Sequence, residues 1–409
     1  MIADLPLSDE GTARIAAGRA PWPCWIEVDL DAVAENVRVL ARAARPRLGV
    51  TAVVKAQAYG LGATAVARAA MEAGARGVAV ARVAEGIQMR QTGLDAPILV
   101  MGGIHPAEAP LVVRHGLQAT VADEIGLTAL ARAAEMQGSV SDVQVKVDSG
   151  MNRYGAAPAD AADLVRRLAT IPSLRLAGFY THFASADERD LWFSRQQVAY
   201  YRSVVAQLET EGYELGVKHV ANSAGALRMD DVGFDTVRAG LALSGSYATE
   251  HVPHNSGLWR AVALKSRVAR LLTPPVGASI GYGRTFKVDR PMRTALVSCG
   301  YADGLPRACS NRGQVLIRGR RAPLVGTVSM DMAMADVTHL PEVQVGDEVV
   351  VLGQQGDATI DLDTFSESAG IIPHELLVRL GARVPRVYFR GSSPVSATSL
   401  LQDVPLDLG

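Results

Sequence analysis

From about residue 50 to residue 240 the sequence alternates short apolar runs with segments of helical period. Eight runs have the length and composition of buried parallel strands: TAVVKA, GVAVAR, APILVMG, QATVAD, DVQVKVD, LAGFYTHF, VKHVAN and TVRAGL. Helical stretches such as residues 63–70, 124–136 and 193–213 separate most of them. Eight strand–helix units over roughly 200 residues predict an α/β fold of the (β/α)8 TIM-barrel type.

After about residue 257 the pattern changes to short β runs broken by glycine and proline. They occupy residues 263–286, 293–305, 313–338 and 345–353, and one helical segment follows at residues 363–381. This pattern predicts a separate β-rich domain. We therefore expect four parts: an N-terminal extension (1–23) with a short helix at 9–18, the barrel (24–257), the β-rich domain (258–390) and a loose tail (391–409).

The composition excludes several classes of protein. The 409 residues are 20% charged and have a formal net charge of −1, without a basic block, so nucleic-acid binding has no support. No window approaches the roughly 18 apolar residues of a membrane span, and the N-terminus lacks a signal pattern, so we expect a cytoplasmic protein. The spacing of Cys24, Cys299 and Cys309 favours neither a disulfide framework nor a metal site.

Polar side chains follow several predicted strands at the point where each strand ends. In chain order they are Lys55, Lys146, His182, Asn222 with Ser223, and Arg238 beside Gly240. The carboxyl ends of the strands form the rim on which such barrels carry their active sites. Each residue alone has an ordinary explanation: the lysine as an ion-pair partner, the histidine as a structural residue, the NSAG turn as a helix N-cap. Their convergence on one rim indicates a functional site.

The same rim combines a lysine with a possible phosphate site. The turns with Ser223 and Gly240 would offer backbone N–H groups to an anion, where barrels commonly bind phosphate. Lys55 would supply the amine that forms a Schiff base with an aldehyde. Together they suggest pyridoxal 5′-phosphate (PLP) as the cofactor.

The sequence also resembles the alanine racemase family in a series of ordered motifs. AVVKAQAYGLG is similar to the PLP-lysine signature of that family. Other similar blocks follow in the same order: KVDSGMNRYG, THFASAD, NSAGAL, VRAGLAL, GYGRTF, GYADGLPRACSNRGQVLIRG, VGTVSMD and GARVPRVYFR. The resemblance covers about residues 24–390. It implies a PLP-dependent isomerase that interconverts L- and D-alanine as a homodimer.

The resemblance implies a role for each matching residue. Lys55 would hold PLP covalently and act as one base, while Tyr282 of the partner subunit would act as the second base on the opposite face of Cα. Arg238 would face the pyridine nitrogen, with His182 hydrogen-bonded to it. The residues that would bind the cofactor are Lys55, Tyr59, Arg153, His182, Ser223, Arg238, Gly240 and His374, of which Tyr59, Ser223 and Gly240 would take the phosphate.

Three further matches concern the substrate. Arg153 would contact both the PLP phenolic oxygen and the substrate carboxylate. Met330 would offer its backbone N–H to the same carboxylate across the dimer, with Asp331 beside it. Lys146 matches a lysine that is carbamylated in some relatives and there steadies the arginine. Without the resemblance, Tyr282 would be interpreted as a turn aromatic and SMDM as a core strand.

Several positions depart from the pattern of the family. Gln57 stands where Asn or Asp is usual, Leu61 replaces a His, Ser244 replaces a Tyr, and Ser329 replaces a common Cys. His374 stands where a Tyr normally reaches the phosphate and narrows the substrate entrance. One methylene of pocket volume decides only about 1–3 kcal/mol. A racemase for serine or another, larger amino acid is therefore an alternative.

Two further alternatives belong to other classes. A PLP-dependent decarboxylase of the same barrel type would carry a Gly-rich phosphate loop and a C-terminal catalytic cysteine, and the sequence has neither pattern. A non-catalytic PLP-binding protein would be a single barrel, in which the β-rich domain with Tyr282 and Asp331 would be superfluous. Failure of the purified, PLP-bearing protein to exchange the α-proton of any amino acid would favour this last alternative.

Overall fold

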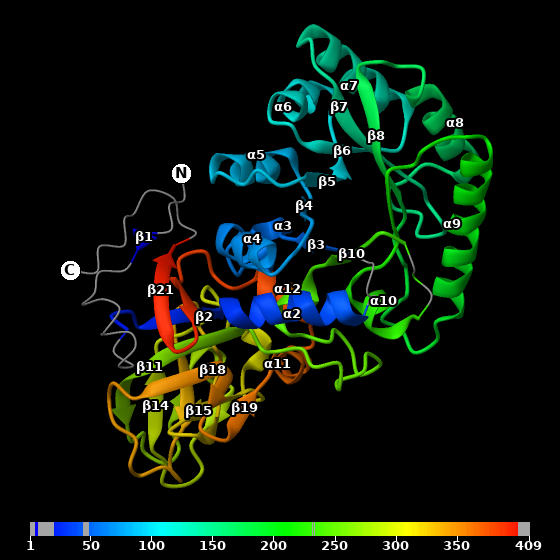
Figure 1. Cartoon of the computed structure of the whole chain (residues 1–409). Coiled ribbons are helices and arrows are strands. Elements are labelled where there is room, and N and C mark those ends of the chain that lie inside the picture. Colours follow the sequence, from blue (N-terminus) through cyan, green and yellow to red (C-terminus); the bar gives the residue numbers. More distant parts are fainter. Residues whose placement is uncertain (1–4, 7–19, 44–48, 231, 233, 400–409) are drawn as a thin grey trace.

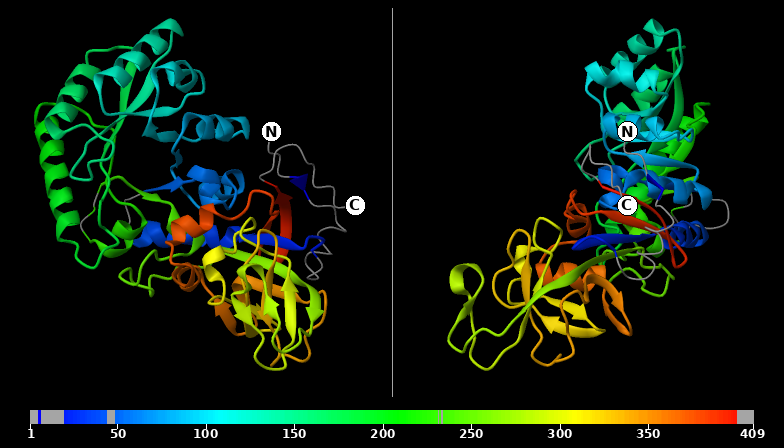
Figure 2. Two further views of the ribbon diagram at one scale, coloured as in Figure 1. Left: turned by 180° about the vertical axis from the view of Figure 1, so that it is seen from behind. Right: turned by 90° about the vertical axis from the view of Figure 1, so that its left-hand side faces the viewer.

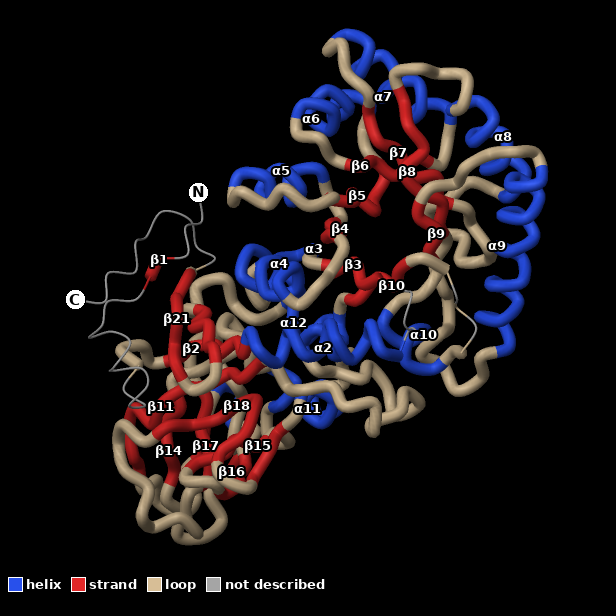
Figure 3. The backbone as a smooth tube through the Cα atoms, viewed as in Figure 1, coloured by secondary structure: helices blue, strands red, loops and turns tan. Residues whose placement is uncertain are grey.

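The computed structural model describes residues 5–6, 20–43, 49–230, 232 and 234–399. It shows a ring of parallel strands with helices outside, joined to a second, β-rich domain (Figures 1 and 3). The helix expected at residues 9–18 lies outside the described residues.

The ring is a parallel eight-stranded sheet in the order β10-β3-β4-β5-β6-β7-β8-β9. The strands are β3 (Gly49–Val53), β4 (Gly77–Val80), β5 (Ile98–Gly103), β6 (Gln118–Val121), β7 (Ser141–Lys146), β8 (Leu174–Tyr180), β9 (Val217–His219) and β10 (Thr236–Ala239). Between β9 and β10 two backbone hydrogen bonds, from Asp235 to Lys218 and from Arg238 to Ala221, nearly close the barrel. All eight predicted strands and the barrel are confirmed.

The helices of this domain pack their apolar faces on the strands. They are α2 (Leu30–Ala43), α4 (Ala63–Glu72), α5 (Val83–Gln91), α6 (Ala109–Arg114), α7 (Glu124–Met136), α8 (Pro158–Leu168), α9 (Trp192–Thr210) and α10 (Ser223–Arg228). Helix α7 begins where the Asp123 carboxylate accepts the N–H of Gly126 at 2.8 Å, an N-cap that satisfies a free donor. None of the helices in the described part of the chain could cross a membrane.

The second domain is built on an 11-stranded sheet with the main order β1-β21-β20-β2-β11-β18-β15-β16. Its strands are β1 (Leu5–Pro6), β2 (Cys24–Asp29), β11 (Val262–Leu272), β14 (Thr294–Val297), β15 (Gln314–Ile317), β16 (Arg320–Pro323), β17 (Ala333–Asp336), β18 (Glu348–Gln355), β19 (Ala358–Ile360), β20 (Arg386–Arg390) and β21 (Ser393–Thr398). Strands β12 (Ser279–Ile280) and β13 (Phe286–Lys287) form a separate hairpin. The domain lies against one side of the barrel in both views of Figure 2.

Three expectations, two about the domain limits and one about a helical segment, differ from the structure. Strand β2, which we placed in the barrel, pairs with β11 and β20 in the other domain, and the chain crosses into the barrel only at α2. The expected loose tail is wrong for residues 393–398, because β21 pairs antiparallel with β20. The helical segment at 363–381 is two helices, α11 (Leu362–Ala369) and α12 (Pro373–Val378), separated by Gly370 at φ 67° and by the proline that opens α12.

A buried hydroxyl in β14 provides a test of this core. Thr294 is fully buried, and its Oγ1 has no hydrogen-bond partner among the residues that the structure describes. We expect Thr294→Val, which keeps the shape and removes an unsatisfied polar group, to stabilise the protein by about 1 kcal/mol in denaturant unfolding. Thr236→Val is the matched control, since the Thr236 hydroxyl is bonded to Thr51 at 3.2 Å. Equal destabilisation by both substitutions would contradict the interpretation of the Thr294 hydroxyl as an unsatisfied polar group.

Candidate active site

The segment after β3 is a left-handed turn. Helix α3 (Lys55–Tyr59) holds Ala56, Gln57, Ala58 and Tyr59 at φ between 50° and 57°, and Gly60 follows at φ 85°. A left-handed conformation costs roughly 1–2 kcal/mol for each residue with a Cβ. Such a run persists only if its surroundings hold it, and strain of this kind gathers at functional sites. The turn places Lys55 and Tyr59 at the rim.

Helix α5 holds one side of this turn. The Glu85 carboxylate accepts the N–H of Ala56 at 2.6 Å and, with its other oxygen, the N–H groups of residues 81 and 82. The Gln57 amide donates to Gln88 at 2.9 Å and accepts the N–H of Ala63 at 3.3 Å. The Gln57 side chain, one of the departures from the family pattern, thus ties the turn both to α5 and to the start of α4.

Lys55 has the environment of a reactive amine. Its side chain is half-buried, and its Nζ lies 5.7 Å from the centroid of the Tyr59 ring. Burial lowers the pKa of Lys55, the charge of Arg153 lowers it further, and Glu85 opposes the change. The site therefore holds a lysine that gives up its proton more readily than a surface lysine does.

Tyr59, Ser223 and Gly240 lie together on one side of the rim. The Ser223 hydroxyl accepts the N–H of Gly240 at 3.2 Å and the N–H of Ala242 at 3.4 Å. A Cβ on Gly240 would stand 2.3 Å from the Tyr59 hydroxyl oxygen, so this close approach requires glycine. Burial raises the pKa of Tyr59, which keeps its hydroxyl a donor. Asn222 caps α10 by accepting the N–H of Gly225, in agreement with the interpretation of the NSAG turn as a helix N-cap.

Arg238 is the centre of a buried hydrogen-bond network. Its Nη2 is 2.9 Å from His182 Nδ1, as expected, and 2.8 Å from the carbonyl oxygen of Thr181, while its Nη1 is 2.5 Å from His219 Nδ1. His219 Nε2 continues the network to Gln144 Oε1 at 2.8 Å. Burial and the Arg238 charge lower the pKa of both histidines well below its ordinary value, so both are neutral.

His219 was not among the residues predicted for this site. Its one signal was the position of this histidine at the end of the predicted strand VKHVAN, next to the rim.

Lys146 and Arg153 add further positive charge. The Nζ of Lys146 lies 5.6 Å from the ring centroids of both Tyr154 and Tyr180, inside cation–π range. Burial lowers the pKa of Lys146 to about 8, and Arg238 and Arg153 contribute to this shift. Arg153 itself is exposed, in a loop whose N–H groups bond to the carboxylate of residue 148.

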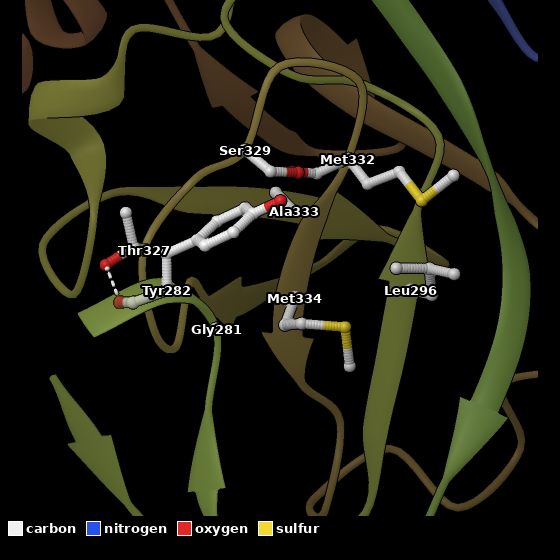
Figure 4. A pocket seen from close by; sticks show the side chains of 8 residues that line it. All are labelled: Gly281, Tyr282, Leu296, Thr327, Ser329, Met332, Ala333 and Met334. Carbon is white, nitrogen blue, oxygen red and sulfur yellow. Dashed lines mark hydrogen bonds between the residues drawn. The ribbon is translucent and has the colours of Figure 1, made fainter. Parts of the chain in front are cut away.

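Tyr282, Met330 and Asp331 lie on the other domain. The Tyr282 side chain is 74% exposed and Met330 is 51% exposed. Tyr282 borders a cavity of about 380 Å³ with two further methionines, and its carbonyl accepts the Thr327 hydroxyl at 2.8 Å (Figure 4). Asp331 pairs with Arg383 at 2.7 Å. Within the described residues no hydrogen bond or ion pair joins any of the three to the barrel rim.

Comparison with known proteins decides the family. The family model described as alanine racemase, N-terminal domain, matches residues 28–248, and the model of the C-terminal domain matches residues 261–388. The chain belongs to the alanine racemase family. It is 42% identical over 368 residues to the alanine racemase of Symbiobacterium thermophilum and 40% identical over 380 residues to that of Desulfosudis oleivorans. Both alignments cover 90% of this chain and 97% of the relative.

Solved structures of the family agree with the fold. The crystal structure of alanine racemase from Bacillus anthracis with bound L-Ala-P matches with a TM-score of 0.87 and 32% sequence identity. The match covers 93% of this chain and 99% of that one. A PLP-dependent isomerase of the alanine racemase family is therefore the correct class, and the decarboxylase alternative is wrong.

The residues present fit PLP. Lys55 supplies an amine with a lowered pKa. The hydroxyl donors of Tyr59 and Ser223, with the bare backbone of Gly240, form a narrow cradle suited to a phosphate. Arg238 Nε makes no hydrogen bond within the described chain, so this donor is available to a bound group. His374, on α12, completes this side, with its ring centroid 5.9 Å from that of Tyr59.

Two of the departures from the family pattern lie in one place. Leu61 and Ser244 line the same small space behind Tyr59, and that space has no room for a water molecule. The Ser244 hydroxyl donates to the carbonyl oxygen of Leu241 at 2.7 Å, so this hydroxyl is satisfied. Leu61 and Ser244 are compatible with each other because the space behind the Tyr59 ring is filled by side chains and holds no water.

The low pKa of Lys146 is open to direct test. At pH 8 about half of its amine should be neutral, and only a neutral amine adds CO2. With ¹³C-bicarbonate we expect a carbamate signal in the NMR spectrum that Lys146→Met abolishes. Lys265 is the internal control, because Glu27 and Glu348 pair with it and raise its pKa. A carbamate on Lys265 rather than Lys146 would show that burial does not select the reactive lysine.

Proposed function

We propose that this chain racemises alanine with Lys55 and Tyr282 as two bases, in an active site shared between two subunits. The observation that carries the proposal is the place of Tyr282. It is exposed on the C-terminal domain without a bond to the rim that holds Lys55, so a second copy is the simplest source of the second base.

Two bases are what racemisation requires. The reaction removes the α-proton from one face of the substrate and returns a proton to the other, and one side chain fixed on one face cannot do both. Bound PLP would supply the electron sink for the pair left on Cα. Lys55 takes or returns the proton at its Nζ, which its lowered pKa favours. The Tyr282 hydroxyl acts on the opposite face.

The other residues bind and orient. Tyr59, Ser223 and the backbone of Gly240 would hold the phosphate, with His374 beside them. Arg238 would donate to the ring nitrogen of the cofactor, and it keeps its proton at neutral pH although burial lowers its pKa to about 10. His182 and His219 fix the plane of that guanidinium by hydrogen bonds.

The substrate carboxylate would meet donors from both subunits. Arg153 contributes from the rim, and the N–H of Met330 contributes from the partner. Asp331, held by Arg383, fixes the backbone next to Met330.

Exposed apolar side chains support the dimer. Tyr282, Tyr301, Met330 and Met332 are between 42% and 74% exposed, around the cavity shown in Figure 4 and the loops next to it. Exposed apolar surface of this kind marks interaction sites.

Mixed dimers test the shared site. Lys55→Ala and Tyr282→Phe subunits should each be inactive alone, because each lacks one base at every site. A mixed dimer should regain one intact site of two, so a statistical mixture should recover roughly a quarter of wild-type activity. A double Lys55→Ala/Tyr282→Phe subunit mixed with wild type is the control. Mixtures of the two single variants that stay inactive would contradict an active site shared across the dimer.

The size of the accepted side chain depends on His374. Burial and the Lys55 charge lower the pKa of His374, so the ring is neutral at the phosphate side of the site. A racemase that also takes serine or a larger amino acid is the second candidate, because an imidazole fills less space than a phenol ring.

Exchange of the α-proton in D2O, followed by NMR for each L-amino acid, tests this candidate. We expect alanine to exchange fastest. We also expect His374→Tyr to lower the serine rate relative to alanine by up to about ten-fold. An unchanged ratio would show that His374 does not set the side-chain preference. Absence of exchange with every amino acid would favour the non-catalytic alternative.

A further inference from the structure

A buried arginine of the C-terminal domain reaches into the barrel. Arg386, in β20, is fully buried, and its Nε donates to the carbonyl oxygen of Gly60 at 3.0 Å. Its other nitrogens donate to the carbonyl oxygens of Gly381 and Val384, both at 2.6 Å, and of Leu380 at 3.0 Å. Within the described residues no carboxylate pairs with it, so backbone carbonyls alone compensate its charge.

The bond to Gly60 falls at the end of the strained turn. Gly60 is the residue that ends the left-handed run, and Leu61 follows it. The Leu61 carbonyl oxygen accepts the hydroxyl of Tyr388 at 3.1 Å. Arg386 and Tyr388 are two apart on one strand, so their side chains leave the same face. Two successive carbonyls after the turn are therefore held by two donors from the other domain.

The fit between the two elements is tight. A Cβ on Gly62 would lie 1.9 Å from the Tyr388 hydroxyl, and a Cβ on Gly60 would lie 2.4 Å from the carbonyl oxygen of Leu377. The chain thus passes between β20 and α12 with glycine at both contacts. Relaxation of the left-handed residues toward ordinary φ values would move this passage and break both hydrogen bonds.

We propose that Arg386 is a positioning residue for the reaction: its hydrogen bond to Gly60 keeps the left-handed turn formed, so that Lys55 and Tyr59 stand at the rim in their working positions. The proposal rests on the roles proposed for Lys55 and Tyr59. In this proposal the C-terminal domain positions active-site residues of its own subunit. This role is separate from the residues that the same domain would contribute to a partner subunit. Tyr388 assists with its hydrogen bond to the Leu61 carbonyl.

A purely structural role would be different. Three of the four hydrogen bonds of Arg386 lie in its own domain, in the loop at residues 380–384. If Arg386 served only that loop, its loss would change the loop and leave residues 55–62 as they are.

Amide hydrogen exchange, followed by mass spectrometry, separates the two roles in the protein freed of PLP. We expect Arg386→Met to speed exchange across residues 55–62 by about ten-fold or more, since a charge-assisted hydrogen bond is lost. Arg390→Met is the matched control, because Arg390 is the same residue type on the same strand and pairs with Asp31 and Glu72 of the barrel. In the described part of the chain it makes no hydrogen bond or ion pair with the turn. It should leave exchange at 55–62 unchanged. Faster exchange confined to residues 380–384 in Arg386→Met would overturn the proposal.

Tyr388→Phe keeps the test decisive if Arg386→Met does not fold, because it removes a single hydroxyl. We expect faster exchange at residues 60–62 and weaker PLP affinity, by about three- to ten-fold, measured by titrating the PLP-free protein. Wild-type exchange and wild-type PLP affinity in this variant would overturn the proposal. Neither readout needs turnover, so an inactive wild-type protein would refute the proposed function without deciding this one.

Discussion

The site depends on a strained stretch of backbone. Four consecutive residues with side chains, Ala56 to Tyr59, have φ near 55°. Glycine adopts this left-handed conformation readily, whereas residues with a Cβ adopt it at a steric cost. The turn is held from α5 by Glu85 and from β20 by Arg386. Without these contacts an Ala-rich segment would favour a right-handed helix. The position of Lys55 is therefore a property of the tertiary structure rather than of its local sequence.

The second constraint is electrostatic. Burial lowers the pKa of both Lys55 and Lys146, and the charge of Arg153 lowers both further. Arg238 adds to the shift of Lys146. Neutral histidines, rather than carboxylates, accept the hydrogen bonds of Arg238, so its charge is not cancelled. The result is a cluster of cations that suits a doubly anionic partner: a phosphate on one side and a substrate carboxylate on the other. Burial keeps both histidines neutral, so they accept hydrogen bonds from Arg238 without adding positive charge to the cluster.

Part of this could be predicted from the sequence. The barrel strands are buried on both faces, so they form continuous apolar runs, and the polar residues that follow them reach one rim by topology. Strand β21 was missed because an edge strand with serine and proline lacks such a run. The left-handed turn was missed because KAQAY has helical composition, and its conformation is imposed by distant residues. His219 and Arg386 were missed for the same reason, since only the folded chain shows what their side chains contact.

The contacts of the turn also bear on why the two domains belong to one chain. The strand that leads into the barrel, β2, is itself paired with β20 in parallel, from Ile26 opposite Arg386 to Asp29 opposite Phe389. The pairing fixes where α2 begins and where Arg386 and Tyr388 meet the barrel. A barrel expressed alone would lose β2's partners and both donors to the residues after the turn. Because the carbonyls of Gly60 and Leu61 are held by donors from the other domain, we expect Lys55 to take its position as the two domains pack together.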